Sequence, residues 1–226
     1  MPVIVSFVSQ KGGVGKSTLA RALAAVAAHS MRVRLADLDP QQASVVEWER
    51  VRERNDAGPP CEVIGYAGAS EAIGRSEDVQ LLILDAPART SSDTLEIAQR
   101  SHLLVQPTGP SADDLRPAVL MFHELVKAGV PKQRLAAAIC RVLTDTEEAA
   151  ARAYMQAAGY EVLAGSILEH PAYRQAQNRG RAITETKVAK LNERADALME
   201  ALLQKVTQEV KARASATQAA RREKAR

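Results

Sequence analysis

Residues 9–18 read SQKGGVGKST and close the apolar, β-branched run VIVSFVS of residues 3–9. After them, Leu19, Leu23 and Val26 recur at helical spacing, so the sequence predicts a strand, a glycine-rich loop and a helix in that order. In such a loop the backbone N–H groups turn inward on phosphate oxygens, and the N-terminus of the helix adds its positive dipole end. The stretch therefore predicts a phosphate-binding loop.

This loop departs from the usual phosphate-loop motif, G-x-x-x-x-G-K-[ST], because Gln10 stands where the first glycine belongs. It also contains a second lysine, Lys11, five positions before Lys16. We expect Lys16 to reach the β and γ phosphates of a nucleotide and Ser17 to bind Mg²⁺. The residues predicted to hold the nucleotide are Gly12, Gly13, Val14, Gly15, Lys16, Ser17 and Thr18.

Strand-like and helix-like runs alternate along the rest of the chain, which predicts an α/β fold with a doubly wound, mostly parallel sheet flanked by helices. The predicted strands cover residues 32–39, 61–66, 81–87, 102–107 and 134–140. The predicted helices cover residues 43–54, 115–129, 147–159 and 182–211. We expect a single domain over residues 1–211 and a basic, disordered tail over residues 212–226, where large apolar side chains are almost absent.

The composition argues against several other classes of protein. Aromatic residues make up only 3% of the 226 residues, so the core must consist of Ala, Val, Leu and Ile. Cys61 and Cys140 are isolated, which argues against zinc, iron–sulfur and disulfide frameworks. No apolar run approaches the roughly 20 residues of a membrane span, and the first residues lead into a strand pattern without a signal peptide. We therefore expect a cytoplasmic protein.

The net charge of +3 is unevenly distributed, since residues 202–226 carry +5 and leave −2 on the remainder. A basic tail can attract a polyanion, although a solvated helix end is the alternative interpretation.

Three carboxylates are expected to accompany the loop. Asp85 ends an apolar strand, at the edge where doubly wound sheets bind ligands, so it can hold Mg²⁺ through a water molecule, or else cap the following turn. Asp37 and Asp39 are alternate residues at the end of another strand, and both can face the phosphates. The dipeptide Asp39-Pro40 is also a common turn opener.

The segment KGGVGKST resembles the deviant Walker A box of the ParA/MinD family of dimeric ATPases, whose additional lysine corresponds to Lys11. The resemblance extends from residue 3 to about residue 200 and is closest to small, ParF-like partition proteins. Its other motifs are DLDPQQAS with the following Trp48, LLILDAP at 81–87, VQPTGPSADDLRP at 105–117 and YRQAQNRGRAITE at 173–185.

The resemblance implies roles for individual residues. Asp39 would position or activate the attacking water, and Asp37 would support the metal shell. Lys11 would reach the phosphates of a partner subunit across a dimer that holds two ATP molecules; an exposed loop lysine is the alternative. The adenine site is expected near Pro107 and Arg141.

The resemblance further implies an ATP-bound homodimer that binds non-specific DNA on the nucleoid and is released when a ParB-like or other cargo adaptor stimulates hydrolysis. The cargo is left open. A membrane-associated, MinD-like protein is the first alternative, disfavoured because the tail lacks large apolar and aromatic residues. A metabolic or metal-cluster enzyme on the same fold is the second. The basic residues predicted to contact DNA are Lys187, Lys190, Arg194, Lys205 and Lys211.

Two further features are given structural interpretations. Ser111 and Asp114 have the spacing of a capping box at the start of a helix. Trp48 lies among apolar helix positions and is expected to pack rather than to contact a ligand.

Overall fold

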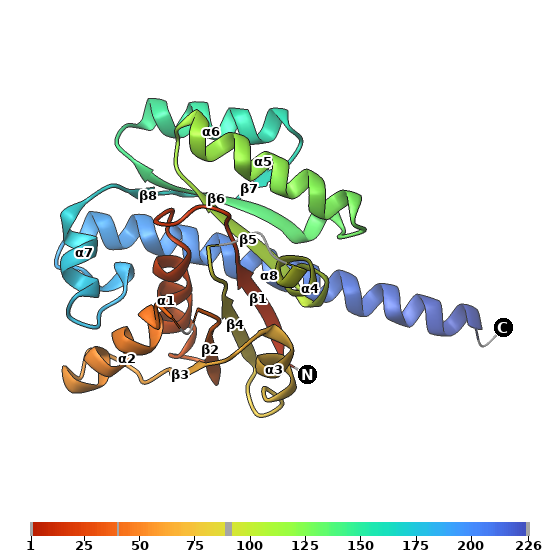
Figure 1. The fold of residues 1–226 in the computed structure, drawn as a ribbon, viewed down its shortest axis with the longest axis horizontal. Coiled ribbons are helices and arrows are strands. Elements are labelled where there is room, and N and C mark those ends of the chain that lie inside the picture. Colours follow the sequence, from red (N-terminus) through yellow and green to blue (C-terminus); the bar gives the residue numbers. More distant parts are fainter. Residues whose placement is uncertain (1, 40, 89–91, 225–226) are drawn as a thin grey trace.

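The computed structural model describes residues 2–39, 41–88 and 92–224 of the chain (Figure 1). Its centre is a sheet of eight strands in the order β3-β2-β4-β1-β5-β6-β7, with β8 beside β6, and the strand pairs between described residues all run parallel. The strands are β1 (Val3–Phe7), β2 (Val33–Asp37), β3 (Glu62–Gly65), β4 (Leu81–Asp85), β5 (Leu103–Thr108), β6 (Leu135–Val142), β7 (Glu161–Val162) and β8 (Ile167–Leu168).

Helices cover both faces of this sheet. They are α1 (Lys16–Ala27), α2 (Ser44–Arg54), α3 (Ala69–Gly74), α4 (Ser92–Arg100), α5 (Ala112–Lys127), α6 (Asp145–Ala157), α7 (Pro171–Gln177) and α8 (Ala189–Lys224), with short 3₁₀ turns η1 (Lys132–Arg134) and η2 (Ile183–Glu185). The predicted doubly wound α/β fold is therefore confirmed. Within the described ranges, no helix is long and apolar enough to cross a membrane.

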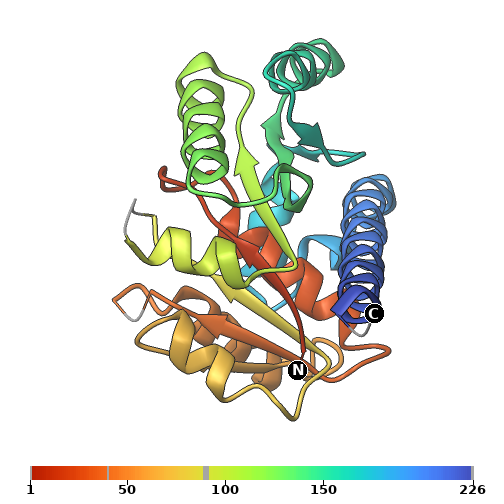
Figure 2. The same cartoon turned by 90° about the vertical axis from the view of Figure 1, so that its right-hand side faces the viewer.

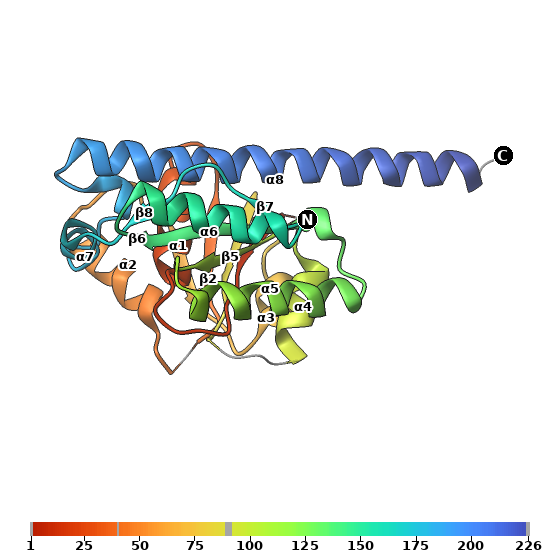
Figure 3. The ribbon, with the colours of Figure 1, turned by 90° about the horizontal axis from the view of Figure 1, so that it is seen from above.

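Alternation along β1 shows how the sequence divides the core. Val5 and Phe7 are fully buried on the face covered by α1, α2, α7 and α8. Ile4 and Val8 are buried on the opposite face, against α3 to α6. Because successive side chains of a strand point to opposite faces, a strand buried on both sides reads as a continuous apolar run. Figures 2 and 3 show α8 on one side of the sheet and α5 on the other.

The C-terminal helix differs from its prediction. A helix beginning at residue 182 was expected to end near residue 211, whereas η2 occupies the first positions and α8 then runs from Ala189 to Lys224. The expected disordered tail is thus helical in all of its described part, because its Ala, Gln, Arg, Lys and Glu residues have high helix propensity even without apolar contacts. The end of α8 extends well past the rest of the domain (Figures 1 and 3).

The sheet brings the predicted carboxylates together. Asp37 and Asp85 are register partners at the carboxyl ends of β2 and β4, and Phe7, the last residue of β1, is paired with Asp85 on the other side. The loop after β1 therefore begins beside both aspartates. This is the edge at which parallel α/β sheets bind ligands.

A close contact between α2 and the turn after α7 generates a stability prediction. Gly180 is buried with φ +73°, and a Cβ there would overlap the backbone of Arg52. Gly180→Ala should lower the free energy of unfolding by about 2 to 5 kcal/mol, because it adds left-handed strain and overpacking. Urea denaturation measures the loss. Gly74→Ala is the control, since a Cβ at Gly74 meets nothing within 4 Å, and its effect should stay within about 1 kcal/mol. Equal effects of the two changes would contradict the prediction.

Candidate nucleotide-binding site

The loop between β1 and α1 has a backbone that requires glycine. Gly13 and Gly15 have φ values of +73° and +112°, in the left-handed region that favours glycine. Gly15 is also the N-cap of α1, and a Cβ there would lie 3.4 Å from Cys140 Sγ. No acidic side chain occupies the first turn of α1, so the N–H groups and the positive dipole end of that helix are open to an anion.

Lys16 lies at the bottom of this loop. Its side chain is buried, and Nζ is 3.4 Å from the backbone oxygen of Lys11, a long hydrogen bond. Burial lowers the pKa of Lys16, while the nearby charges of Asp85 and Asp39 oppose that shift. The ammonium group thus lies near two carboxylates but forms no ion pair with a described residue, which leaves it available to a phosphate.

Asp85 and Ser17 fit the predicted metal position. Asp85 is buried, and burial, together with the charge of Asp37, raises its pKa to about 7, although a hydrogen bond from Ser17 opposes the shift. Its Oδ1 has no hydrogen-bond partner among the described residues. A buried carboxylate oxygen without a partner, next to a hydroxyl group, suits a hard cation such as Mg²⁺, whose preferred ligands are oxygens.

Asp37 and Asp39 do different things, although both were expected to face the phosphates. Asp37 accepts hydrogen bonds from the backbone N–H of Asp39 at 3.0 Å and of Val45 at 3.2 Å, so it holds the loop between β2 and α2. Asp39 accepts from the N–H of Gln42 at 3.2 Å and lines the cavity that contains Lys16. The structure therefore gives Asp37 a positioning contact, and its place in a metal shell stays a prediction.

Two cavities adjoin at the loop. One, of about 290 Å³, is lined by residues that include Gly12, Gly13, Lys16, Ser17, Asp39 and Asp85. The other, of about 390 Å³, is lined by residues that include Gly13, Gly15, Thr18, Arg141, His170 and Arg174. Because both contain Gly13, a phosphate chain in the first cavity can continue into a nucleoside in the second.

The two residues predicted near adenine are placed differently. Arg141 lines the second cavity with a left-handed φ of +60°, and its Nε donates to Glu169 at 3.1 Å. Arg174 also pairs with Glu169, at 2.5 Å. Pro107 is instead buried behind the loop, where it would be 3.8 Å from a Cβ at Gly15, and it is absent from the described lining of both cavities. Pro107 thus lies beside Gly15, which lines the second cavity, and its place near adenine stays a prediction.

Lys11, which the resemblance would have reach a partner subunit, here contacts α5 of its own domain. Its Nζ lies 2.9 Å from Asp114 Oδ1, with the Lys11 side chain 41% exposed. The predicted capping box is also wrong, since Ser111 makes no side-chain cap and its Oγ donates to Asp114 Oδ2 at 3.0 Å. Asp114 thus serves the loop lysine rather than the helix N-terminus.

Arg21 belongs to the site but was not predicted. It is one turn after Ser17 on α1, and this spacing of four is the signal that sequence reasoning missed. Its guanidinium donates to the carbonyl oxygen of Ser44 at 2.6 Å and to Gln177 Oε1 at 3.0 Å. Arg21 therefore ties the phosphate-loop helix to the start of α2 and to α7, close to the charges of Asp85 and Asp37.

The predicted DNA-binding stripe on the C-terminal helix is only partly available. Arg194 pairs with Glu148 and hydrogen-bonds Ser166, and Lys205 lies 2.7 Å from Glu161 and 3.0 Å from Glu209 with 11% exposure. The charges of these two side chains are thus already paired within the domain, and their contact with DNA stays a prediction. The remaining three residues are exposed: Lys187, Lys190 and Lys211.

Comparison with known proteins finds related sequences and similar folds. A curated relative is the maintenance of carboxysome distribution protein A of Gloeobacter kilaueensis, which is 34% identical over 133 residues, or 55% of this chain. The aligned part spans 57% of that relative's length.

Solved structures share the fold at low sequence identity. An ATP complex of a variant of Cyanothece McdA has a TM-score of 0.70 at 18% identity, covering 89% of this chain and 96% of the other. MinD of Pyrococcus horikoshii OT3 with Mg-ADP has a TM-score of 0.71 at 19% identity and the same coverage. A putative plasmid partition protein of Borrelia burgdorferi B31 bound to AMPPNP has a TM-score of 0.69 at 17% identity, covering 91% and 100%.

The family of CobQ/CobB/MinD/ParA nucleotide-binding domains matches residues 5–183, which include the glycine loop, both strand-end aspartates and Arg141. This chain belongs to that family.

Proposed function

We propose that this protein is an ATPase of the ParA type, which dimerises on binding Mg-ATP and uses partner-stimulated hydrolysis to position a large cargo. The observation that carries the proposal is the pair of lysines in one loop. Lys16 is buried at the base of the glycine loop, whereas Lys11 is paired with Asp114 near the surface, and this difference supports separate roles for the two lysines.

The site residues divide the chemistry among them. The loop N–H groups and Lys16 would bind the phosphates, and Ser17 and Asp85 would hold Mg²⁺, which would supply positive charge against the phosphate oxygens. Asp39 lines the phosphate cavity with an oxygen that can orient a water molecule for attack. Asp37 and Arg21 fix the backbone that carries Asp39, through Val45 and Ser44 respectively.

Lys11 supplies the link to a second subunit. In the dimer its ammonium group leaves Asp114 and reaches the partner's phosphates, where a cation provided in trans stabilises developing charge as an arginine finger does. ATP then joins the two subunits, and hydrolysis separates them.

The names of the relatives bear on the kind of cargo. One relative is named for carboxysome distribution and a structural neighbour for plasmid partition, so a positioning role is favoured and both kinds of cargo stay open. We infer non-specific DNA on the nucleoid as the surface, with a ParB-like or other adaptor as the stimulating partner. An adaptor, shell-protein or chemotaxis gene beside this one would name the cargo.

Two alternatives have discriminating observations. A MinD-like protein would float with liposomes in the presence of ATP. A metal-cluster enzyme on this fold would need accessible thiolates, but Cys61 and Cys140 are buried and burial raises the pKa of Cys140 to about 12. These buried thiols favour the positioning ATPase over the cluster enzyme.

The dimerisation step is tested by Lys11→Ala. The variant should bind ATP but stay monomeric in light scattering, and its phosphate release should fall by about tenfold or more, because the charge supplied in trans is lost. Lys127→Ala, which changes an exposed lysine at the end of α5, is the control and should behave like the wild type. Normal dimerisation and hydrolysis by Lys11→Ala would refute the proposal.

The ion pair between Lys11 and Asp114 gives a second prediction. Asp114→Asn should strengthen ATP-dependent dimerisation by about three- to tenfold, because two half-exposed ion pairs no longer compete with the interface. Sedimentation at a series of protein concentrations measures the dissociation constant. The neighbouring exposed Asp113→Asn is the matched control. Weaker dimerisation of Asp114→Asn would show that the carboxylate is needed in the dimer itself.

Asp85 makes stability depend on pH in a defined direction. Its pKa of about 7 exceeds the ordinary 3.8, so the nucleotide-free folded state binds this proton more tightly than the unfolded chain, and stability falls as pH rises from 4 to 8. Asp85→Asn removes this loss and should be more stable than the wild type at pH 8 by up to about 4 kcal/mol, with the difference vanishing near pH 4. Denaturation of both proteins across this range measures it.

Mg-ATP provides the control for this experiment. With saturating Mg-ATP at pH 8 the order should reverse, because the carboxylate then faces a cation that the amide holds less well. A stability difference that does not change with pH would contradict the assignment of Asp85.

A further inference from the structure

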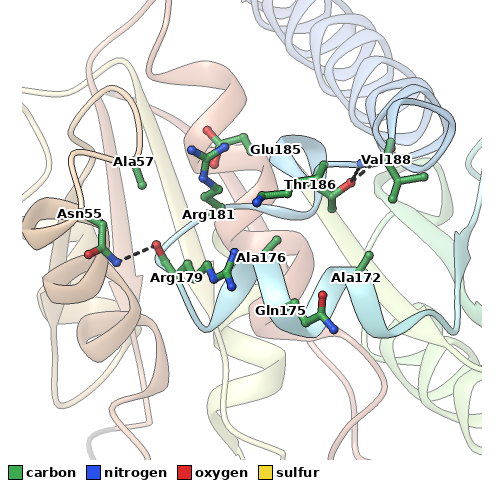
Figure 4. A pocket seen from close by; sticks show the side chains of 11 residues that line it. Asn55, Ala57, Ala172, Gln175, Ala176, Arg179, Arg181, Glu185, Thr186 and Val188 are labelled. Atoms are coloured by element: carbon green, nitrogen blue, oxygen red, sulfur yellow. Dashed lines mark hydrogen bonds between the residues drawn. The ribbon is translucent and has the colours of Figure 1, made fainter.

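A basic groove lies between the end of α2, helix α7 and the segment that joins α7 to α8 (Figure 4). Its volume is about 520 Å³, and none of its described lining residues belongs to the two nucleotide cavities. Three small side chains and three cations are among these residues: Ala57, Ala172, Ala176, Arg179, Arg181 and Lys187.

The described residues offset only part of the positive charge of the groove, through the interaction of Glu185 with Arg181. The described lining contains one carboxylate, Glu185, and both of its oxygens are taken by the buried Arg52, at 2.7 and 2.8 Å. No ion pair forms on Arg179, Arg181 or Lys187 within the described part of the chain, and all three side chains are exposed. The groove therefore presents three cations to a ligand from solution.

The chemistry of the lining favours a phosphodiester backbone. Arginine matches phosphate oxygens with paired donors, and the floor of alanine side chains lets a chain approach closely. The described lining contains no aromatic ring on which a base or a protein side chain could stack. We infer that this groove binds the backbone phosphates of double-stranded DNA without sequence preference; the inference rests on the proposed function and moves the main contact from α8 to α7 and its following turn.

Helix α2 and the residue after it hold the backbone of the turn that carries Arg179 and Arg181. Three consecutive carbonyl oxygens accept hydrogen bonds from it: Arg179 from Asn55 at 3.1 Å, Gly180 from Arg52 at 2.9 Å and Arg181 from Trp48 at 3.2 Å. The first turn of α2 is bound in turn to Asp37, which holds the loop that carries Asp39. A shift of that loop around bound ATP moves α2 and, with it, the groove, which makes DNA binding depend on the nucleotide.

The test compares two double variants of the full chain. Arg179→Ala with Arg181→Ala removes two cations of the groove, and Arg100→Ala with Lys127→Ala removes two exposed cations elsewhere. Retention on a random-sequence duplex is measured with Mg-ATP from about 50 to 200 mM salt, where each lost phosphate contact lowers the slope of log affinity against log salt by about one. We expect this slope to fall by about two for each groove that contacts DNA in the groove variant, and to equal the wild-type slope in the control. Light scattering with ATP shows that each variant is folded.

The outcomes separate this inference from the proposed function. If the wild type binds DNA with ATP and the groove variant binds equally well with the same slope, the groove is not the site, although the function stands. If the wild type binds no DNA at any of these salt concentrations, both fail. If poly-glutamate displaces DNA from the wild type but is not held by the groove variant, and binds more tightly than DNA, an acidic protein segment is the occupant and the inference is overturned. Should the double variant not fold, Lys187→Ala carries the same test, with a slope lower by about one.

Discussion

The site depends on the burial of two carboxylates side by side. They belong to Asp37 on β2 and Asp85 on β4, which are partner positions of adjacent strands. Both are buried, and burial raises the pKa of each. The charge of Asp37 adds to the shift of Asp85, and the charge of Asp39 adds to the shift of Asp37. Two like charges in a buried place are unfavourable unless each finds donors or a cation. The positive charges of Lys16 and Arg21 interact with Asp85 and oppose the rise in its pKa.

The two aspartates resolve the same difficulty in opposite ways. Asp37 is satisfied by backbone N–H groups, which turns it into a clamp on the loop that follows β2. Asp85 receives one hydroxyl hydrogen bond and keeps Oδ1 without a partner among the described residues. The carboxylate of Asp37 thus fixes the backbone of the loop, whereas the carboxylate of Asp85 keeps an oxygen that can bind a divalent cation. Two buried carboxylates that both lacked hydrogen-bond donors, as Asp85 Oδ1 does, would destabilise this edge of the sheet.

Local sequence was sufficient for the parts of the site that local structure fixes. The glycine loop, Lys16, Ser17 and the strand-end aspartates follow from a strand, a turn and a helix start, and the structure places them where those elements put them. Lys11 with Asp114 is different, because the two residues are 103 positions apart and meet only through the pairing of β1 with β5. The spacing of Ser111 and Asp114 also fits a helix cap, so the sequence alone cannot decide whether Asp114 caps the helix or pairs with Lys11. The helical residues beyond 211 were misjudged for another reason, since low apolar content removes packing but leaves helix propensity intact.

Helix α2 shows most clearly what sequence patterns leave out. Trp48, Arg52 and Asn55 follow one another at spacings of four and three, so they lie on one face of the helix, and the sequence pattern predicted packing for Trp48 alone. In the structure this face binds three successive carbonyl oxygens of a turn about 130 residues away in the chain. If α2 moves as a rigid body, a displacement of its face at the turn after α7 also displaces the other end of the helix. Because that other end begins at Ser44, five residues after Asp39, α2 connects the loop that carries Asp39 with the turn after α7.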